Sequence, residues 1–354
     1  MKEKHNFKVI LEAFGLDFRH YLVQDFGVGL INSTFVLKKG EATAFVLQRI
    51  NTKVFPNPQL IASNWSLAHQ YLKITAPNYF MPLFQKTQKG ADFFVDEQGN
   101  YWRLLPFIKD SSCFETAPNI HLAKEAANAF GHFAALLSGA PLDQFNVVLP
   151  GFHDLKLRQQ QFDAAVENAS EQRLLIAAEQ IEKLNAYRWI TDFYNRNIGR
   201  LPVRIVHMDA KISNILFDSA GKKVKCIIDM DTLMPGTLLS DFGDLIRSMV
   251  CEAAEDETNI EKIVIRSEMP QVIFDGYTDA LEYVLEPLER EILPFGGPML
   301  IYMQALRFLA DYLSNDVYYP VRYQQHNLDR AWNQIIILEK LLKEPFFAKQ
   351  GFIP

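Results

Sequence analysis

The stretch from Ile205 to Asp218 most constrains what this chain can fold into. It reads Ile-Val-His-Met-Asp-Ala-Lys-Ile-Ser-Asn-Ile-Leu-Phe-Asp, so polar residues stand between apolar pairs. This pattern predicts a polar loop held rigidly between two short buried strands. On such a loop Asp209 can accept a proton from a hydroxyl group, and Asn214 can supply a neutral oxygen to a hard divalent cation.

A second polar cluster follows after about one hairpin length. The apolar run Cys226-Ile227-Ile228 ends abruptly in Asp229, and Asp231 follows two residues later. A carboxylate at the end of a buried strand can hold a divalent cation that is bound to nucleotide phosphates. Asp229 and Asp231 are therefore predicted metal ligands, together with Asn214.

The two clusters also resemble those of a known family. The first fits the H-x-D-x-x-x-x-N form of a kinase catalytic loop, with Asp229 in the place of the kinase metal-binding acid. In this order and spacing they resemble the aminoglycoside phosphotransferase and choline kinase superfamily, whose members have a protein-kinase-like fold and act on small molecules. Three longer motifs resemble those of the N-acetylhexosamine 1-kinases: Asp229-Met230-Asp231-Thr232, Met234-Pro235-Gly236 and Asp241-Phe242-Gly243-Asp244-Leu245-Ile246-Arg247.

The resemblance implies ATP and Mg²⁺ as cofactors and a role for each loop residue. Asp209 would orient and deprotonate the accepting hydroxyl. Lys211 matches the catalytic-loop Lys of protein kinases and would steady the moving phosphoryl group, with an exposed loop Lys as the alternative. His207 is expected to support the loop, and Asp241 is expected to brace it through backbone hydrogen bonds.

A glycine-containing hairpin near the N-terminus is a candidate nucleotide flap. Gly27 and Gly29 stand between two predicted strands, and glycine lets backbone N–H groups approach a phosphate closely. Ordinary turn chemistry is the alternative for such a pair. Asn32 stands where protein kinases have a third glycine, which resembles the Gly-x-x-Asn form of the aminoglycoside phosphotransferases. These three residues are predicted nucleotide contacts.

The third predicted strand, residues 43–50, departs from the kinase pattern. Alternation places Gln48 where the phosphate-pairing Lys of kinases belongs, and Arg49 on the other side. Either Gln48 contacts the phosphates, or a bulge at this strand end turns Arg49 inward. We favour Arg49, because few other basic residues lie near this strand end. The helix predicted at 59–73 has no interior Glu to complete the usual Lys–Glu pair.

The overall pattern predicts an α+β, two-lobed, protein-kinase-like fold. Residues 1–108 would form the small nucleotide-binding lobe with an antiparallel sheet, and residues 109–354 a larger, mainly helical catalytic lobe. By resemblance, the backbone from Pro106 to Ile108 would pair with the adenine edge. The predicted small-lobe strands are residues 21–26, the part of 27–37 that follows the glycine turn, 43–50, 81–87, 91–95 and 101–108, with helices at 7–14 and 59–73. The predicted large-lobe helices begin at 119 and continue at 152–169, 172–196, 238–254, 270–283, 287–315 with a break near Pro294, and 327–343.

Three charged residues of the larger lobe are candidate substrate contacts. Arg307 and Asp311 are four residues apart on one helix face with apolar flanks, although such a pair is most often a surface pair. By resemblance to the hexosamine kinases, Arg307 would contact a sugar. Arg247 is a further candidate, with a salt bridge inside the lobe as its alternative.

Composition excludes several classes of function. The 354 residues carry 36 basic and 42 acidic side chains, so the net charge of −6 argues against a nucleic-acid partner. Three scattered cysteines form no disulfide framework and no metal-ligand spacing. The polar start predicts neither a signal peptide nor a membrane span, so we expect a cytoplasmic protein. The oligomeric state stays open.

The sequence therefore predicts a kinase that uses ATP and Mg²⁺ on a small-molecule hydroxyl. The leading substrate is the anomeric hydroxyl of an N-acetylhexosamine, and choline or ethanolamine, homoserine and an aminoglycoside are alternatives. A nucleotide-binding pseudokinase is a second hypothesis, motivated by the missing strand Lys. The presence of Asp209, Asn214 and Asp229 together argues against it.

Overall fold

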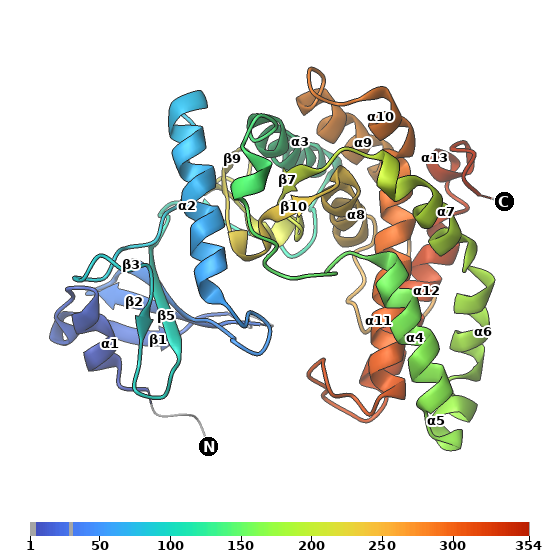
Figure 1. Cartoon of the computed structure of the whole chain (residues 1–354), viewed down its shortest axis with the longest axis horizontal. Coiled ribbons are helices and arrows are strands. Elements are labelled where there is room, and N and C mark those ends of the chain that lie inside the picture. Colours follow the sequence, from blue (N-terminus) through green and yellow to red (C-terminus); the bar gives the residue numbers. More distant parts are fainter. Residues whose placement is uncertain (1–4, 28–30, 354) are drawn as a thin grey trace. The chain divides into compact units, whose positions relative to one another are not determined.

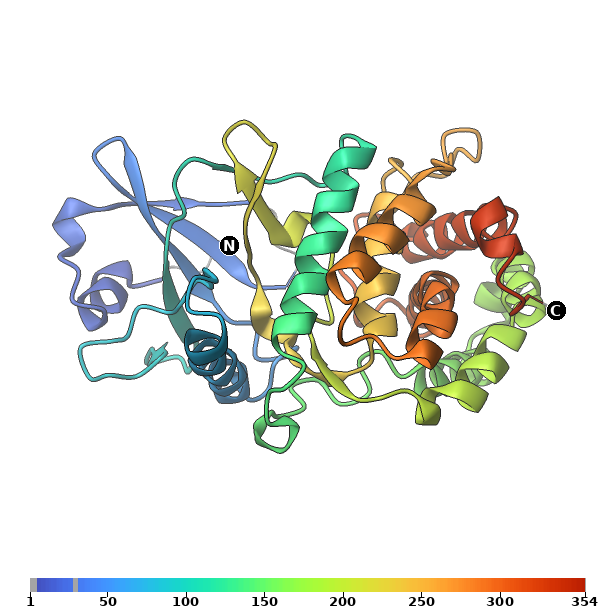
Figure 2. The same cartoon turned by 90° about the horizontal axis from the view of Figure 1, so that it is seen from above.

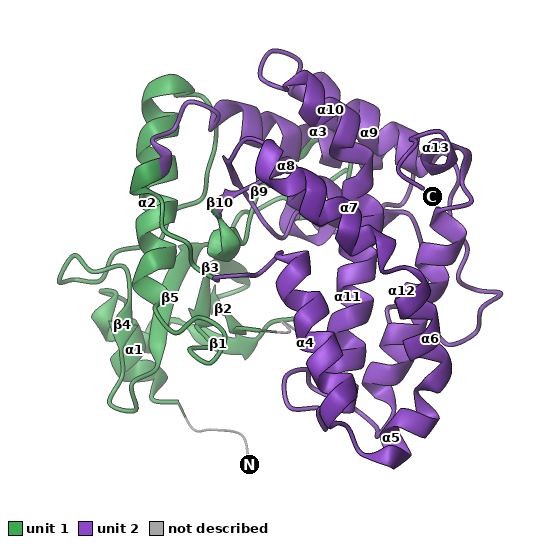
Figure 3. Ribbon diagram, turned by 45° about the vertical axis from the view of Figure 1, so that its right-hand side comes forward, with its two compact units in different colours: residues 1–112, 143–149, 216–234 green, residues 113–142, 150–215, 235–354 purple. Residues whose placement is uncertain are grey.

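The chain forms two compact units in a computed structural model that describes residues 5–27 and 31–353 (Figure 3). Unit 1 comprises residues 1–112, 143–149 and 216–234, and unit 2 comprises the rest. Unit 1 thus contains the segment predicted as the small lobe and two further segments from later in the chain. An antiparallel sheet in unit 1 and a mainly helical unit 2 confirm the predicted kinase-like fold class.

The sheet of unit 1 has five antiparallel strands (Figure 1). In spatial order they are β1 (Leu22–Asp25), β2 (Ser33–Lys39), β3 (Ala42–Arg49), β5 (Tyr101–Pro106) and β4 (Phe94–Val95). The prediction of a strand at 81–87 is wrong, since this segment contributes only one isolated β-bridge, between Gln85 and Leu104. Pro82 lies within it and has no N–H to donate to a neighbouring strand.

Two helices pack on opposite faces of this sheet. The α1 helix (Phe7–Ala13) buries Ile10 and Leu11 in a cluster that includes Trp102 and Leu104 of β5. Side chains alternate along a strand, so Arg103 faces the other way. Its guanidinium carbon lies 5.5 Å from the ring centre of Trp65, which belongs to α2 (Pro58–Thr75).

A buried amide joins the two later segments to unit 1. The Nδ2 atom of Asn64, on α2, donates to the carbonyl oxygens of Asn146 and Leu233, each at 2.8 Å. Its Oδ1 atom accepts from the backbone N–H of Asn146 at 2.8 Å. The segment 216–234 also contributes to a three-stranded sheet formed by β6 (Ser111–Ser112), β8 (Ile215–Asp218) and β9 (Val224–Ile227).

Unit 2 is built around helix α11 (Gly296–Leu313), whose side chains are mostly buried. Helices α4 (Leu155–Asn168), α8 (Leu238–Met249) and α12 (His326–Leu341) pack against it. The remaining helices are α3 (Ile120–Leu136), α5 (Glu171–Ile176), α6 (Ala178–Ala186), α7 (Trp189–Asn197), α9 (Met269–Ala280), α10 (Pro287–Ile292) and α13 (Pro345–Ala348). Two short strands, β7 (Arg204–Val206) and β10 (Met234–Gly236), pair with each other.

Two helix predictions for this unit had different outcomes. The break near Pro294 is confirmed, because a 3₁₀ turn at Leu293–Phe295 separates α10 from α11. The single helix predicted at 172–196 is wrong, since three helices occupy this range. Ala177 and Tyr187 end α5 and α6 with ψ of 8° and 11°, where the backbone leaves the helical path.

One stretch of the described residues, Pro287–Leu313, is long and apolar enough to cross a membrane by length and composition alone. In its most apolar window, 89% of the residues are buried inside the protein. Buried core helices pass the same test, so the stretch is only weak support for a membrane span.

Helices α3 and α9 lie side by side (Figure 2), and glycines at their contact let them approach closely. A Cβ atom on Gly131 of α3 would lie 2.5 Å from the carbonyl oxygen of Tyr277 on α9. A Cβ on Gly276 of α9 would lie 2.6 Å from the carbonyl oxygen of Lys124 on α3. A side chain at either position would force the two backbones apart.

We predict that Gly131→Ala lowers the free energy of unfolding by about 1–3 kcal/mol, the usual range for overpacking a filled interior. Urea denaturation measures this change. Gly199→Ala is the matched control, because no atom lies within 4 Å of a Cβ built at that position. Equal effects of the two substitutions would contradict the packing explanation.

Candidate active site

A buried carboxylate holds the start of the predicted catalytic loop in unit 2. The backbone N–H groups of His207 and Met208 donate to the Oδ2 and Oδ1 atoms of Asp241, at 3.0 and 2.8 Å. The expected bracing by Asp241 is therefore confirmed. Burial, together with the nearby Asp244 and Asp209 charges, raises the pKa of Asp241 to about 7 despite these two bonds.

The two hydrogen bonds to Asp241 hold the loop at a strained residue. Met208 has a φ of +64°, in the left-handed region that residues other than glycine rarely adopt. The adjacent strand leaves room for the Met208 side chain, because a Cβ on Gly236 would lie 2.1 Å from Met208 Cε. Strain of this kind persists only where surrounding bonds fix it, which is typical of functional loops.

The predicted catalytic residues of this loop lie together. The Nζ atom of Lys211 forms a 2.9 Å ion pair with Asp209 Oδ2, and the Nδ2 atom of Asn214 donates to the same oxygen at 2.9 Å. Burial raises the pKa of Asp209, but the Lys211 ammonium and the Asn214 amide favour its charged form and leave the pKa below its usual value. Asp209 is therefore ionised and can accept a proton.

The orientation of the Asn214 amide suits a cation ligand. Its nitrogen donates to both the backbone oxygen and Oδ2 of Asp209, at 2.8 and 2.9 Å. Its oxygen consequently points away from Asp209, and no hydrogen bond between described residues uses it. A neutral oxygen of this kind fits Mg²⁺.

Of the two acids predicted as metal ligands in unit 1, Asp229 has the more exposed side chain. Asp229 adopts a φ of +60°, a second left-handed residue at a predicted functional position. Asp231 is 3% exposed, and both its oxygens accept hydrogen bonds from the guanidinium of Arg103. Asn32 Nδ2 also donates to Asp231, at 2.8 Å. Three donors thus already use the oxygens of Asp231, which neutralises a buried guanidinium.

Arg103 is a buried charged residue that the sequence-based predictions missed. Its side chain is 1% exposed, and its Nε atom donates to Gln48 Oε1 at 2.9 Å. Gln48 in turn donates to Thr34 Oγ1 at 3.2 Å. The position predicted for a kinase Lys therefore holds a Gln–Arg pair from two neighbouring strands. One sequence signal could have revealed it. Arg103 lies between Trp102 and Leu104 in a predicted strand, and the alternation of side chains there indicates that both faces are buried.

The register of β3 excludes the bulge that would turn Arg49 inward. From Phe45 onward, pairing continues without interruption to the strand end, where Arg49 lies opposite Ser33 on one side and Trp102 on the other. The alternative based on a bulge is therefore wrong. Arg49 Nη2 instead donates to Ser33 Oγ at 3.3 Å.

The structure also locates the other predicted nucleotide contacts. Gly27 has a φ of +72°, the conformation for which glycine is suited, whereas Gly29 lies outside the described residues. Asn32 Oδ1 accepts from the Asn51 N–H at 2.9 Å. Pro106 ends β5, and the carbonyl oxygen of Ile108 accepts from Ser111 Oγ at 2.6 Å.

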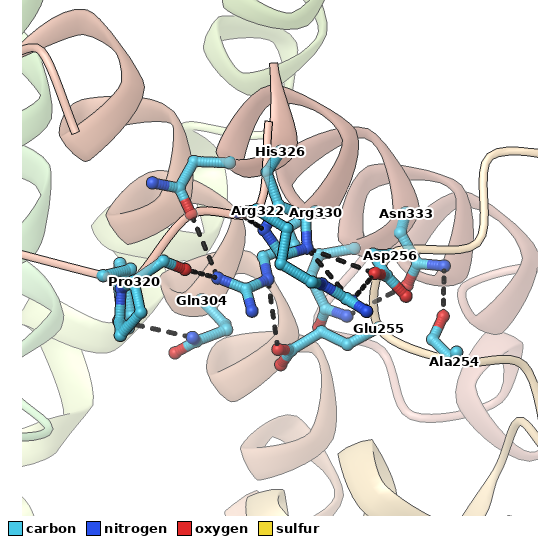
Figure 4. Close-up of polar contacts among 12 residues, drawn as sticks. Ala254, Glu255, Asp256, Gln304, Pro320, Arg322, His326, Arg330 and Asn333 are labelled. Carbon is cyan, nitrogen blue, oxygen red and sulfur yellow. Dashed lines mark hydrogen bonds and ion pairs between the residues drawn. The ribbon is translucent and has the colours of Figure 1, made fainter. Parts of the chain in front are cut away.

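Arg247 forms salt bridges inside unit 2, which was the alternative to its predicted contact with the substrate. It lies 3.1 Å from Asp244 and 3.6 Å from Glu255. Figure 4 shows how the loop that carries Glu255 is tied to α12. Arg330 lies 3.8 Å from Glu255, and His326 Nε2 lies 3.1 Å from the neighbouring Asp256.

Arg307 and Asp311 have separate partners instead of pairing with each other. Asp311 accepts from the backbone N–H groups of Tyr318 and Tyr319, at 2.8 and 2.9 Å, and so braces the segment after α11. The rings of these tyrosines and of Phe152 then surround the Arg307 guanidinium, with centres 5.5 to 5.9 Å away. Asp311 thus positions aromatic rings around a cation.

Comparison with known proteins identifies the family. The phosphotransferase enzyme family, APH, matches residues 23–264, which is more than half of the chain. The chain belongs to this family. It is therefore an enzyme that transfers a phosphoryl group to a hydroxyl group of a small molecule.

Solved structures with little sequence identity share the fold of this phosphotransferase. A microcompartment-associated aminopropanol kinase is 15% identical, with a TM-score of 0.65 and 98% of each chain covered. An aminoglycoside phosphotransferase from Alicyclobacillus acidocaldarius is 12% identical, with a TM-score of 0.63 and coverage of 99% of this chain and 96% of that one. Spectinomycin phosphotransferase in complex with ADP and spectinomycin is 10% identical, with a TM-score of 0.58 and coverage of 95% and 96%.

We predict that Arg103→Met lowers the free energy of unfolding of this phosphotransferase by about 3–5 kcal/mol, because it leaves the Asp231 carboxylate buried without its cation. Denaturant titration measures the loss. The double variant Arg103→Met/Asp231→Asn should lose much less than the sum of the two single variants.

The matched control is Arg19→Met, which breaks an ion pair with Asp17 in which the Arg side chain is 85% exposed. This control should change stability very little. Additive losses in the double variant would show that Arg103 and Asp231 do not depend on each other.

Proposed function

We propose that this phosphotransferase is an ATP- and Mg²⁺-dependent kinase of an N-acetylhexosamine and that it phosphorylates the anomeric hydroxyl. The observation that carries the proposal is the ionised Asp209, fixed by Lys211 and Asn214 on a loop that Asp241 clamps. The choice of substrate is supported by the sequence motifs from Asp229 to Arg247, which resemble those of the N-acetylhexosamine 1-kinases.

Each loop residue has a distinct task in the proposed reaction. Asp209 accepts the proton of the sugar hydroxyl and orients its oxygen for attack. Lys211 keeps Asp209 ionised and offers positive charge next to the oxygen. When bound, ATP with Mg²⁺ supplies the phosphoryl group, and the Asn214 oxygen and the Asp229 carboxylate are the proposed metal ligands.

The surroundings of Arg307 support a sugar over an amino alcohol or an aminoglycoside. Arg307 offers donors to hydroxyl and carbonyl oxygens, and the rings of Phe152, Tyr318 and Tyr319 lie against its guanidinium. A cationic substrate needs acidic or aromatic surfaces that are not already occupied by a cation. Here a guanidinium already occupies the space between the rings.

We expect Asp209→Asn to lower turnover by about two to four orders of magnitude while nucleotide still binds, because the substitution removes the proton acceptor and keeps the size of the side chain. ATP consumption with N-acetylglucosamine, N-acetylgalactosamine, choline, homoserine and kanamycin tests activity and substrate choice together. Asp192→Asn, an exposed substitution on α7, is the control and should keep full turnover. Near-normal turnover of Asp209→Asn would refute its role.

We also expect Asp229→Ala to abolish the effect of Mg²⁺ on nucleotide affinity, because the cation and the triphosphate would lose a carboxylate ligand. Calorimetric titration of ATP at several Mg²⁺ concentrations measures this. Asp143→Ala, an exposed substitution on the short helix Leu142–Gln144, is the control and should keep the normal dependence. An unchanged Mg²⁺ dependence in Asp229→Ala would remove Asp229 from the metal site.

A further inference from the structure

Two arginines of unit 2 meet at one residue, Phe152. The Nη2 atom of Arg158, on α4, donates to the carbonyl oxygen of Phe152 at 3.0 Å. The guanidinium carbon of Arg307, on α11, lies 5.5 Å from the centre of the Phe152 ring. The packing of α4 against α11 thus brings two positive charges to opposite parts of the same residue.

Neither guanidinium is neutralised by an acid. Arg158 donates to the amide oxygen of Gln161 at 2.9 Å, and Arg307 donates to that of Gln304 at 3.2 Å. The ion pairs formed by residues 5–27 and 31–353 include neither arginine. Burial lowers the pKa of Arg158, and repulsion by Arg307 lowers it further.

Other arginines of unit 2 have the acidic partners that Arg158 and Arg307 lack. Asp154 is the acid whose charge acts on Arg158. Its Oδ1 atom caps α4 by accepting a hydrogen bond from the Leu157 N–H at 3.1 Å. The paired arginines of unit 2 include Arg173 with Asp316, Arg204 with Glu289, Arg247 with Asp244 and Arg330 with Glu255.

Two polar atoms beside the pair have no partner among the described residues. They are the Nε atom of Arg158 and the Nδ1 atom of His153, both buried. The His153 ring stacks on Phe152 with centres 4.4 Å apart. Burial, followed by the charge of Arg307, lowers the pKa of His153 to about 3, so the ring is neutral. A buried donor next to two unneutralised cations indicates a missing acceptor.

We propose that Arg158 and Arg307 form a subsite for an anionic group of the substrate, so that the preferred acceptor is an acidic N-acetylhexosamine that carries a carboxylate or a sulfate. This inference rests on the proposed function and narrows its substrate class. Guanidinium groups bind planar carboxylates and sulfate-like oxyanions through paired hydrogen bonds. The charge of Asp209 also acts on His153, where it raises the pKa against the effects of burial and of Arg307.

Calorimetric binding of three sugars to the full chain tests the subsite without relying on turnover. The probes are N-acetylglucosamine, N-acetylglucosamine 6-sulfate and N-acetylmuramic acid, which place a neutral group, a sulfate and a carboxylate at different positions. We expect at least one acidic probe to bind about tenfold or more tightly than the neutral sugar. Raising the salt concentration should weaken the acidic probe selectively.

Substitutions then assign the effect to the two arginines. Arg158→Gln and Arg307→Gln should each weaken the acidic probe by about ten- to a hundredfold and the neutral sugar far less. Arg158→Lys should retain part of the acidic affinity. Arg196→Gln, an exposed arginine on α7, is the matched control and should change neither probe.

The outcomes separate the inference from the proposed function. The subsite is refuted if neutral and acidic sugars bind the wild type equally, or if Arg158→Gln weakens both equally. It is also refuted if only the neutral sugar binds and is phosphorylated, in which case the proposed function stands. Selective binding of an acidic sugar through the arginines, without ATP consumption, would uphold the subsite and refute the kinase function.

Discussion

The backbone bonds to Asp241 are the interaction on which the proposed chemistry depends. They hold a left-handed Met208, and the turn at Met208 sets the direction in which Asp209 leaves the strand. The ion pair with Lys211 and the amide of Asn214 then fix the carboxylate of Asp209. Because these contacts are short and local to the loop and α8, the proton acceptor is positioned before any substrate binds, and little reorganisation is left for the reaction itself.

The sequence predicted the loop of unit 2 well for a physical reason. Asp209, Lys211 and Asn214 lie within six residues of each other, so their proximity follows from the chain itself. The strand alternation in unit 1 also placed Gln48 correctly relative to Arg49. Arg103 was missed because its partners are Gln48, 55 residues away, and Asp231, 128 residues away, and no local pattern reports pairings over such separations.

Two further errors have a similar origin. The apolar residues at 81–87 fit a strand pattern, but Pro82 removes a donor, and its carbonyl oxygen accepts from Trp65 instead. The pattern at 172–196 is helical throughout, yet the backbone turns at Ala177 and Tyr187 divide it into three helices. In unit 2, Arg247 had two sequence-based interpretations, and burial between Asp244 and Glu255 could be recognised only from the fold.

The anchor that Asp311 provides for the segment after α11 has an evolutionary consequence. Asp311 binds this segment through the main-chain N–H groups of residues 318 and 319, not through their side chains. Exchanging either tyrosine would therefore change the rings around Arg307 while leaving the anchor intact, provided that the new residue is not proline. Under the proposed function, substrate preference can therefore change through single substitutions at these two positions, without disturbing the loop that carries Asp209.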